Sequence, residues 1–145
     1  MRSIDSYGSG AFGSVRDGGK RKHEGVDYVA SPGQTAAAPI AGTIVRIGYA
    51  YKKDTRLKFV EIDNAGTGYS ARVLYVSPTI AIGQQVAAGD VIGVVQDLSV
   101  KYPAGITNHV HVEIRDPTGV TLDSAFILPS APILQASTEA FGASP

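Results

Sequence analysis

The chain contains no cysteine, no excess of one charge and no long apolar run, and each absence removes a class of protein. Without cysteine there is no disulfide, no thiolate zinc site and no cysteine nucleophile, so His, Asp and Glu remain as metal ligands. Lys plus Arg and Asp plus Glu both number 13, which gives a formal charge of zero. A basic field that would attract nucleic acid or anionic lipid is therefore missing, and we expect no nucleic-acid partner.

No segment approaches the roughly 20 apolar residues that a membrane helix needs. The first 13 residues are polar and glycine-rich, without the apolar stretch of a signal peptide. We therefore expect neither a membrane span nor a signal peptide, and an activity outside the cell would require some other means of release. The 145 residues suit one compact domain.

Glycine and proline punctuate the chain between short runs of β-branched and aromatic residues. Seventeen glycines and eight prolines in this arrangement are typical of an all-β chain with many tight turns. The pattern predicts strands at 27–30, 43–49, 58–63, 69–76, 91–95 and 109–115, with a weaker one at 35–38. Their spacing favours antiparallel sheets in a β-sandwich or flattened barrel with a groove and few or no helices.

Two further segments carry weaker signals. Residues 49–56 show no apolar alternation and are predicted to form an exposed loop that lines a groove. Residues 123–128 are predicted to begin one short helical turn, which Pro129 would stop. We expect one domain at 1–128 and a loosely held tail rich in Ala, Ser and Pro at 129–145.

The three histidines fall into two tight clusters, one at 23–27 and one at 109–111. Side chains alternate along a strand, so His109, His111 and Glu113 share one face while the intervening valines share the other. The apolar face would anchor the strand rigidly, as a metal site requires of its scaffold. The histidines would then point together into a cleft.

Zinc accepts imidazole nitrogen and carboxylate oxygen, and a catalytic site uses three protein ligands with a fourth position left open. His23, Asp27 and one histidine of the 109–111 pair supply that number. Alone, His-x-x-x-Asp arises by chance in many proteins, and a strand-borne His-x-His is often two solvated imidazoles on a polar sheet face. Together, with no histidine left over, the two clusters favour a site for a single zinc ion.

Four segments also occur in the order seen in the lysostaphin-type M23 metallopeptidases, namely 25–27, 38–42, 82–89 and 109–113. The chain resembles this family from about residue 7 to residue 128. The resemblance implies antiparallel sheets around a groove, one zinc ion, and hydrolysis of peptide bonds in peptidoglycan cross-links. It thus implies a lytic zinc endopeptidase that acts on peptidoglycan peptides at the bacterial cell wall, and we expect a monomer.

Carried over residue by residue, the resemblance makes His23, Asp27 and His111 the zinc ligands and His109 a catalytic group. Active members usually place a second catalytic histidine in a Tyr-x-His-Leu segment, where this chain has Tyr75. A neutral phenol there could donate a hydrogen bond to a developing oxyanion. The alternative is that Tyr75 packs as an ordinary strand tyrosine.

Three nearby residues are further candidates. Tyr102 is a second possible hydrogen-bond donor to the substrate, and Asn108 could bind the substrate backbone, although an asparagine before a strand is just as often a turn residue. Glu113 could orient a ligand imidazole, as carboxylates behind metal ligands commonly do.

The same tyrosine, with segments 101–103 and 105–111, is also similar to vertebrate leukocyte chemotaxins, zinc-binding relatives regarded as lacking peptidase activity. The alternative function is therefore a catalytically inactive zinc module that binds cell wall or a protein partner. Those relatives are secreted and rich in cysteine, so this chain favours a bacterial or phage source, such as a phage lysis or virion protein. A biotinyl or lipoyl carrier has similar hairpins, but it needs an exposed lysine, and none lies between Gly66 and Val100.

Overall fold

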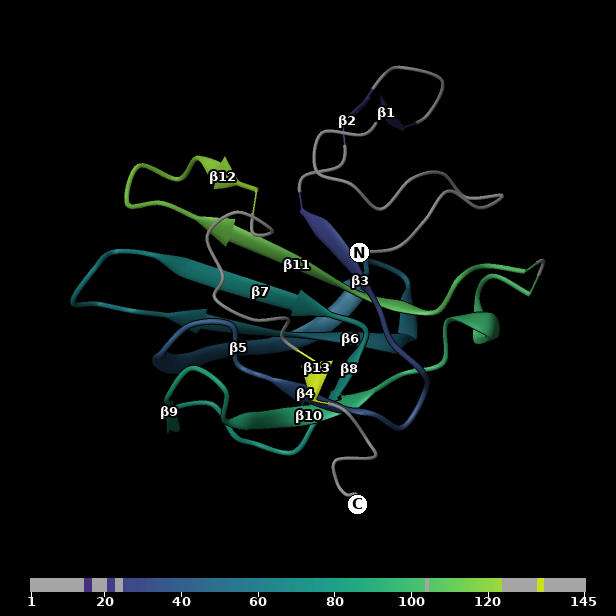
Figure 1. Ribbon diagram of the computed structural model, residues 1–145, viewed down its shortest axis with the longest axis horizontal. Helices are drawn as coiled ribbons and strands as arrows, with labels where there is room; N and C mark the ends of the chain where they lie inside the picture. Colours follow the sequence, from purple (N-terminus) through teal and green to yellow (C-terminus); the bar gives the residue numbers. More distant parts are fainter. Residues whose placement is uncertain (1–14, 17–20, 23–24, 104, 124–132, 135–145) are drawn as a thin grey trace.

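The computed structural model describes residues 15–16, 21–22, 25–103, 105–123 and 133–134 (Figure 1). Its elements, in chain order, are β1 Val15–Arg16, β2 Arg21–Lys22, β3 Val26–Val29, β4 Thr35–Ala37, β5 Gly42–Tyr51, β6 Asp54–Asp63, β7 Ser70–Leu74, β8 Val76–Pro78, β9 Gln85–Val86, β10 Val91–Val95, the 3-10 turn η2 Leu98–Val100, β11 His109–Arg115, β12 Thr121–Leu122 and β13 Ile133–Leu134. Among these residues η2 is the only helical element, and no helix is long and apolar enough to cross a membrane.

The strands form two main sheets, in which every pairing is antiparallel. The larger sheet has the order β12-β11-β7-β6-β5-β9, with β3 added against β11, and the smaller has the order β13-β4-β10-β8. In Figure 1 the larger sheet crosses the body of the molecule and the smaller one lies below it. The all-β, antiparallel prediction is therefore confirmed.

The hydrophobic core joins these two sheets. Val110, Val112 and Ile114 of β11 are fully buried, together with side chains from β4, β8 and β10. Fully burying a valine or isoleucine contributes about 1.5–3 kcal/mol each. Strand β11 is therefore held firmly by one face, and its other face is left to carry the histidines.

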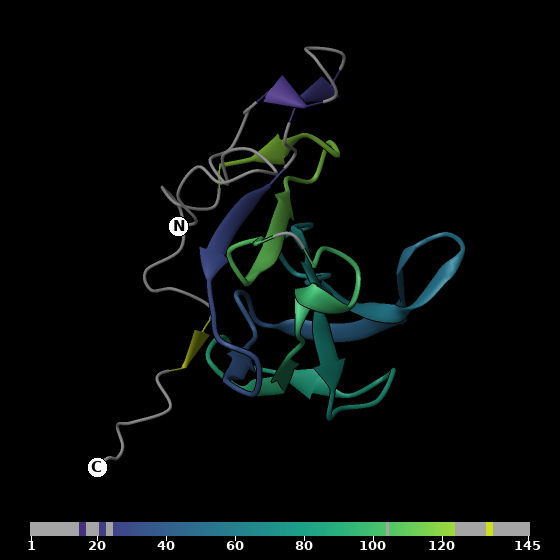
Figure 2. The same cartoon turned by 90° about the vertical axis from the view of Figure 1, so that its right-hand side faces the viewer.

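The prediction of a loop at 49–56 is wrong. Strand β5 runs to Tyr51 and β6 begins at Asp54, so the two strands form one long hairpin whose arm projects from the body (Figure 2). Most side chains of the arm are exposed or only half-buried. A strand that buries neither face needs no apolar alternation, so the residues of this arm carry no pattern that predicts a strand.

The strand predicted at 69–76 is interrupted at Tyr75. This residue has a φ of +74°, in the left-handed region that bulky side chains rarely adopt. Its N–H donates to the Lys58 carbonyl at 2.6 Å, and its carbonyl accepts from the Gln96 N–H at 2.9 Å. These two bonds hold a conformation that costs on the order of 1–3 kcal/mol and separate β7 from β8.

Three remaining predictions, two of them near the C-terminus, have different outcomes. Strand β13 lies inside the segment predicted as a loose tail and pairs with β4 through Ile133 and Leu134. The weaker strand predicted at 35–38 is confirmed as β4. The helical turn predicted from Asp123 falls mainly on 124–128, which lie outside the described residues.

Candidate metal centre and active site

Three polar side chains are buried in the part of the chain that the structure describes, and they lie together. Asp27, His109 and His111 are 1%, 4% and 8% exposed, and the other buried side chains are aliphatic or aromatic. Burying a carboxylate is costly unless it is paired or bound to a metal. The structure thus brings three of the predicted site residues, Asp27, His109 and His111, together in space.

Strand pairing brings them together. Strand β3 pairs antiparallel with β11 so that Asp27 lies directly opposite His111. Directly opposed residues point to the same face of a sheet, with their Cβ atoms about 4.5–5.5 Å apart. Alternation along β11 then adds His109 to that face, so three residues from two distant segments share one buried site.

The His111 imidazole is held at both nitrogens. Its Nδ1 lies 2.8 Å from Asp27 Oδ1 and its Nε2 lies 3.0 Å from Glu113 Oε2. Burial lowers the pKa of His111, but the hydrogen bonds with Asp27 and Glu113 outweigh it and raise the pKa to about 9. Glu113 accepts the hydrogen bond from Nε2, so Nδ1 is the nitrogen that would bind a metal ion, and it would lose its proton on binding.

His109 is oriented differently. Its Nδ1 donates to the Thr107 carbonyl at 2.7 Å, which fixes the proton of the neutral ring on that nitrogen. Its Nε2 lies 3.3 Å from Asp27 Oδ2. His109 therefore presents a basic nitrogen beside the carboxylate that it shares with His111.

These donors fit zinc in their chemistry, since imidazole nitrogen and carboxylate oxygen are its usual ligands. Within the described ranges no three of them are already arranged around a metal position. The contact of 2.8 Å between Asp27 Oδ1 and His111 Nδ1 already brings two of these donors together. The third predicted ligand, His23, lies outside the described residues.

Tyr75 closes one side of this site. Its ring meets the His109 ring edge-on, with centroids 5.5 Å apart. Its hydroxyl lies 2.8 Å from the hydroxyl of Tyr51, which lies 2.6 Å from that of Tyr102. The structure thus brings both predicted tyrosines to a cluster of three that contacts His109.

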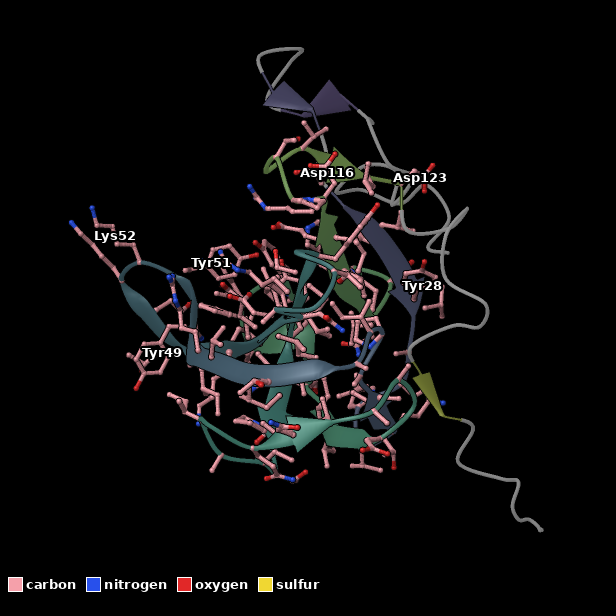
Figure 3. The ribbon with its side chains drawn as sticks, turned by 90° about the vertical axis from the view of Figure 1, so that its left-hand side faces the viewer. Tyr28, Tyr49, Tyr51, Lys52, Asp116 and Asp123 are labelled. Carbon is pink, nitrogen blue, oxygen red and sulfur yellow. The ribbon has the colours of Figure 1, made fainter. Side chains whose placement is uncertain are left out.

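Tyr51 is the member of this cluster that sequence reasoning missed. The pairing of β5 with β6 shifts register between Tyr49 and Tyr51. In Figure 3, Tyr51 points toward the body of the molecule and Tyr49 lies on the other side of the hairpin. Because irregular pairing of this kind re-aims a side chain and leaves no mark on composition, no pattern singled Tyr51 out.

Asn108 has a framework role in this structure. Its Oδ1 accepts from the Leu98 N–H at 2.8 Å, and its Nδ2 donates to the carbonyls of Ala30 and Gln96 at 2.8 Å and 3.0 Å. The side chain therefore joins the segments around η2, β3 and β10. Its predicted contact with substrate stays a prediction.

The sequence pattern of peptidase family M23 matches residues 21–124, a range that contains the strands of the site. The chain belongs to peptidase family M23. Family members are generally zinc-dependent peptidases, in keeping with the donors assembled here.

Individual relatives span two kinds of protein. Leukocyte cell-derived chemotaxin-2 of the mouse is 33% identical over 121 residues, which cover 83% of this chain and 77% of the relative. The catalytic domain of the antimicrobial peptidase lysostaphin from Staphylococcus simulans has a TM-score of 0.63 at 24% identity, covering 83% of this chain and 90% of that one. A structure of LytU has a TM-score of 0.65 at 22% identity, covering 89% of this chain and 93% of that one. These two structures share the fold.

Gly25 allows the imidazole of His111 to approach β3. A Cβ added there would press on the Val112 carbonyl and lie 2.8 Å from His111 Nε2. We expect Gly25→Ala to destabilise the protein by about 1–3 kcal/mol, as overpacking does, and to weaken zinc binding. Urea unfolding and zinc titration measure the two effects. Gly66→Ala, whose Cβ comes no closer than 3.4 Å to other atoms, is the control and should stay within about 0.5 kcal/mol; equal effects in both variants would contradict the prediction.

Glu113 supports His111 from behind and is itself held by Arg115 at 3.3 Å. We expect Glu113→Gln to lower zinc affinity by about 10-fold, because partners of this kind account for about 10–100-fold. Competition with a chromogenic chelator measures the affinity. Glu61→Gln is the matched control, since Glu61 pairs with Arg72 on the neighbouring strands. The role assigned to Glu113 is wrong if both variants bind zinc alike.

Proposed function

We propose that this chain is a zinc-dependent endopeptidase that hydrolyses peptide bonds in the cross-links of bacterial peptidoglycan. The observation that carries the proposal is the buried carboxylate of Asp27 between two differently oriented imidazoles in an M23 domain. A lytic enzyme of this kind would act at the cell wall, whether free or as part of a phage particle.

In this proposal His23, Asp27 and His111 hold the zinc ion. A bound zinc ion supplies a Lewis acid, which polarises the scissile carbonyl and makes water acidic enough to ionise near neutral pH. His109 moves the proton: its Nε2 accepts it from the attacking water and returns it to the leaving amine. Histidine suits both directions of that transfer because an imidazole can accept and return a proton near neutral pH.

Tyr75 is proposed to donate a hydrogen bond to the oxygen on which negative charge develops. Either hydroxyl can donate in each of these two contacts, and the order in which Tyr102 donates to Tyr51 and Tyr51 donates to Tyr75 is the one that directs the Tyr75 proton to another acceptor. Burial, with the neighbouring Tyr75, raises the pKa of Tyr51 above its usual range, which keeps Tyr51 a neutral donor. The cluster thereby supports Tyr75 as a hydrogen-bond donor beside His109.

Removing the Tyr75 hydroxyl tests this role. We expect Tyr75→Phe to lower kcat by about 100-fold at unchanged zinc content, in line with the loss of one oxyanion donor. Tyr49→Phe is the control, because Tyr49 is 54% exposed and lies across the hairpin. If Tyr75→Phe hydrolyses as fast as the unchanged protein, Tyr75 is a packing residue.

A second function is favoured by the tyrosine at the place where active M23 peptidases usually have histidine. The chain would then be a zinc-containing module that binds cell wall or a protein partner without cleaving it. The similarity to a chemotaxin at 33% identity supports keeping this alternative.

Release of new amino groups from purified peptidoglycan by the zinc-loaded protein decides between the two functions. We expect release that disappears in a chelated sample and in Asp27→Ala. Sedimentation with the wall and no amino-group release from several wall types would instead establish the binding module.

A further inference from the structure

A pocket of about 540 Å³ lies beside the tyrosine cluster, at the end of the β5–β6 hairpin. Its lining is made by Tyr51, Lys53, Asp54, Thr55, Arg56 and Lys101. Lys101 comes from the end of η2, so the pocket joins the hairpin to the segment that also carries Tyr102. No residue of this pocket other than Tyr51 belongs to the site described above.

The pocket carries three cations and one acid, and the acid is already satisfied. Arg56 donates from Nε to Asp54 Oδ1 at 3.0 Å and from Nη2 to Asp54 Oδ2 at 2.8 Å. The hydrogen bonds from Arg56 hold the pKa of Asp54 well below its usual range, so Asp54 is ionised at neutral pH. One carboxylate among three cations leaves the pocket with an excess of two positive charges.

Lys101 is held in place before any ligand arrives. Its Nζ lies 3.6 Å from Asp54 Oδ2, 4.4 Å from the centroid of the Tyr51 ring and 5.8 Å from that of Tyr102. An ammonium group over aromatic faces is attracted to the rings. Because its rotamers are already restricted, binding a ligand costs this lysine less conformational entropy than it would cost a free surface lysine.

The pocket is close to the buried site. The centroid of Tyr51 lies 6.2 Å from that of Tyr75, which lies 5.5 Å from that of His109. An extended peptide covers about 3.3–3.6 Å per residue, so about three to four residues span these two steps. A peptide that reacts beside His109 would therefore reach the pocket with a residue about three to four positions from the scissile bond.

We propose that this pocket is a subsite for a carboxylate of the substrate peptide, bound by Lys101 and Lys53 about three to four residues from the scissile bond. The inference rests on the proposed function, since it takes the ligand to be a wall peptide. Lys101 and Lys53 supply the charge, Thr55 a hydroxyl, and the Tyr51 ring an apolar wall for the carbon chain. A polymer of phosphates needs a track of cations along its backbone, and a single pocket joined to the site by aromatic rings suits one carboxylate better.

The test is a binding titration on the full chain, followed by NMR, with an alanine-glutamate-lysine-alanine stem tetrapeptide. Its carboxylates are free in one sample and amidated in the other. We expect the free acid to bind about 5- to 10-fold more tightly than the amide, and Lys101→Gln to abolish that difference. Lys52→Gln is the matched control, because Lys52 is exposed at the hairpin tip and points away from the body (Figure 3).

Each outcome decides the proposal separately from hydrolysis, because binding is read directly. A preference for the free acid that needs Lys101, with no amino-group release, would support the subsite and overturn the proposed peptidase. Equal binding of acid and amide by a protein that does hydrolyse wall would overturn the subsite alone. Binding of a glycerol-phosphate teichoic acid that needs Lys101, without preference for the acidic peptide, would reassign the pocket to phosphate and overturn the proposal.

Discussion

Asp27→Asn is expected to abolish hydrolysis and to weaken zinc binding by more than about 100-fold. Partners behind the ligands already account for about 10–100-fold in affinity, and Asp27 is proposed to be a ligand itself. The amide keeps the shape of the side chain but removes the negative charge that would attract a cation to Asp27 and His111. Zinc affinity by chelator competition and amino-group release from peptidoglycan measure the two losses.

The control for this variant is Asp63→Asn, an exposed carboxylate at the end of β6. Circular dichroism melts of both variants without metal separate loss of ligation from loss of folding. Zinc bound by Asp27→Asn as tightly as by the unchanged protein would remove Asp27 from the ligand set.

His109→Ala is expected to separate metal binding from catalysis. A group that transfers protons contributes about 10²–10⁴-fold, so kcat should fall by that amount while one zinc ion per chain remains bound. The reason is geometric, since His109 Nδ1 is committed to the Thr107 carbonyl and its Nε2 faces Asp27 at the longer distance of 3.3 Å.

His111→Ala is the comparison variant for His109→Ala, because it removes the histidine that is proposed to bind zinc. Loss of zinc in His111→Ala with retention in His109→Ala would assign ligand and proton carrier as proposed. Loss of zinc in both would make His109 a ligand as well, and the opposite pattern would exchange the two roles.

Much of the site could be predicted because strand alternation is a strict rule. The pattern 109–115 placed His109, His111 and Glu113 on one face, and the structure has them there, with the intervening valines fully buried. Likewise the nearness of Asp27 to His111 follows once β3 pairs with β11. That pairing itself is a long-range event, which a single sequence does not encode in any local pattern.

The parts that could not be predicted depend on irregular backbone. The left-handed conformation of Tyr75 and the shifted pairing near Tyr51 bring the hydroxyls of the two tyrosines together. Nothing in the identity of a tyrosine predicts either irregularity. The strands of the hairpin arm could not be predicted for a related reason. Apolar periodicity arises when one face of a strand is buried, and the arm buries little of either face.

The pairing of β13 with β4 affects how readily one molecule associates with another. Strand β4 lies between β13 and β10, so Ile133 and Leu134 occupy what would otherwise be the open rim of the smaller sheet. An exposed edge strand offers unpaired backbone N–H and C=O groups to a strand from another molecule, and such pairing leads to aggregation. A version trimmed before Ile133 would therefore be harder to keep in solution, however complete its metal centre.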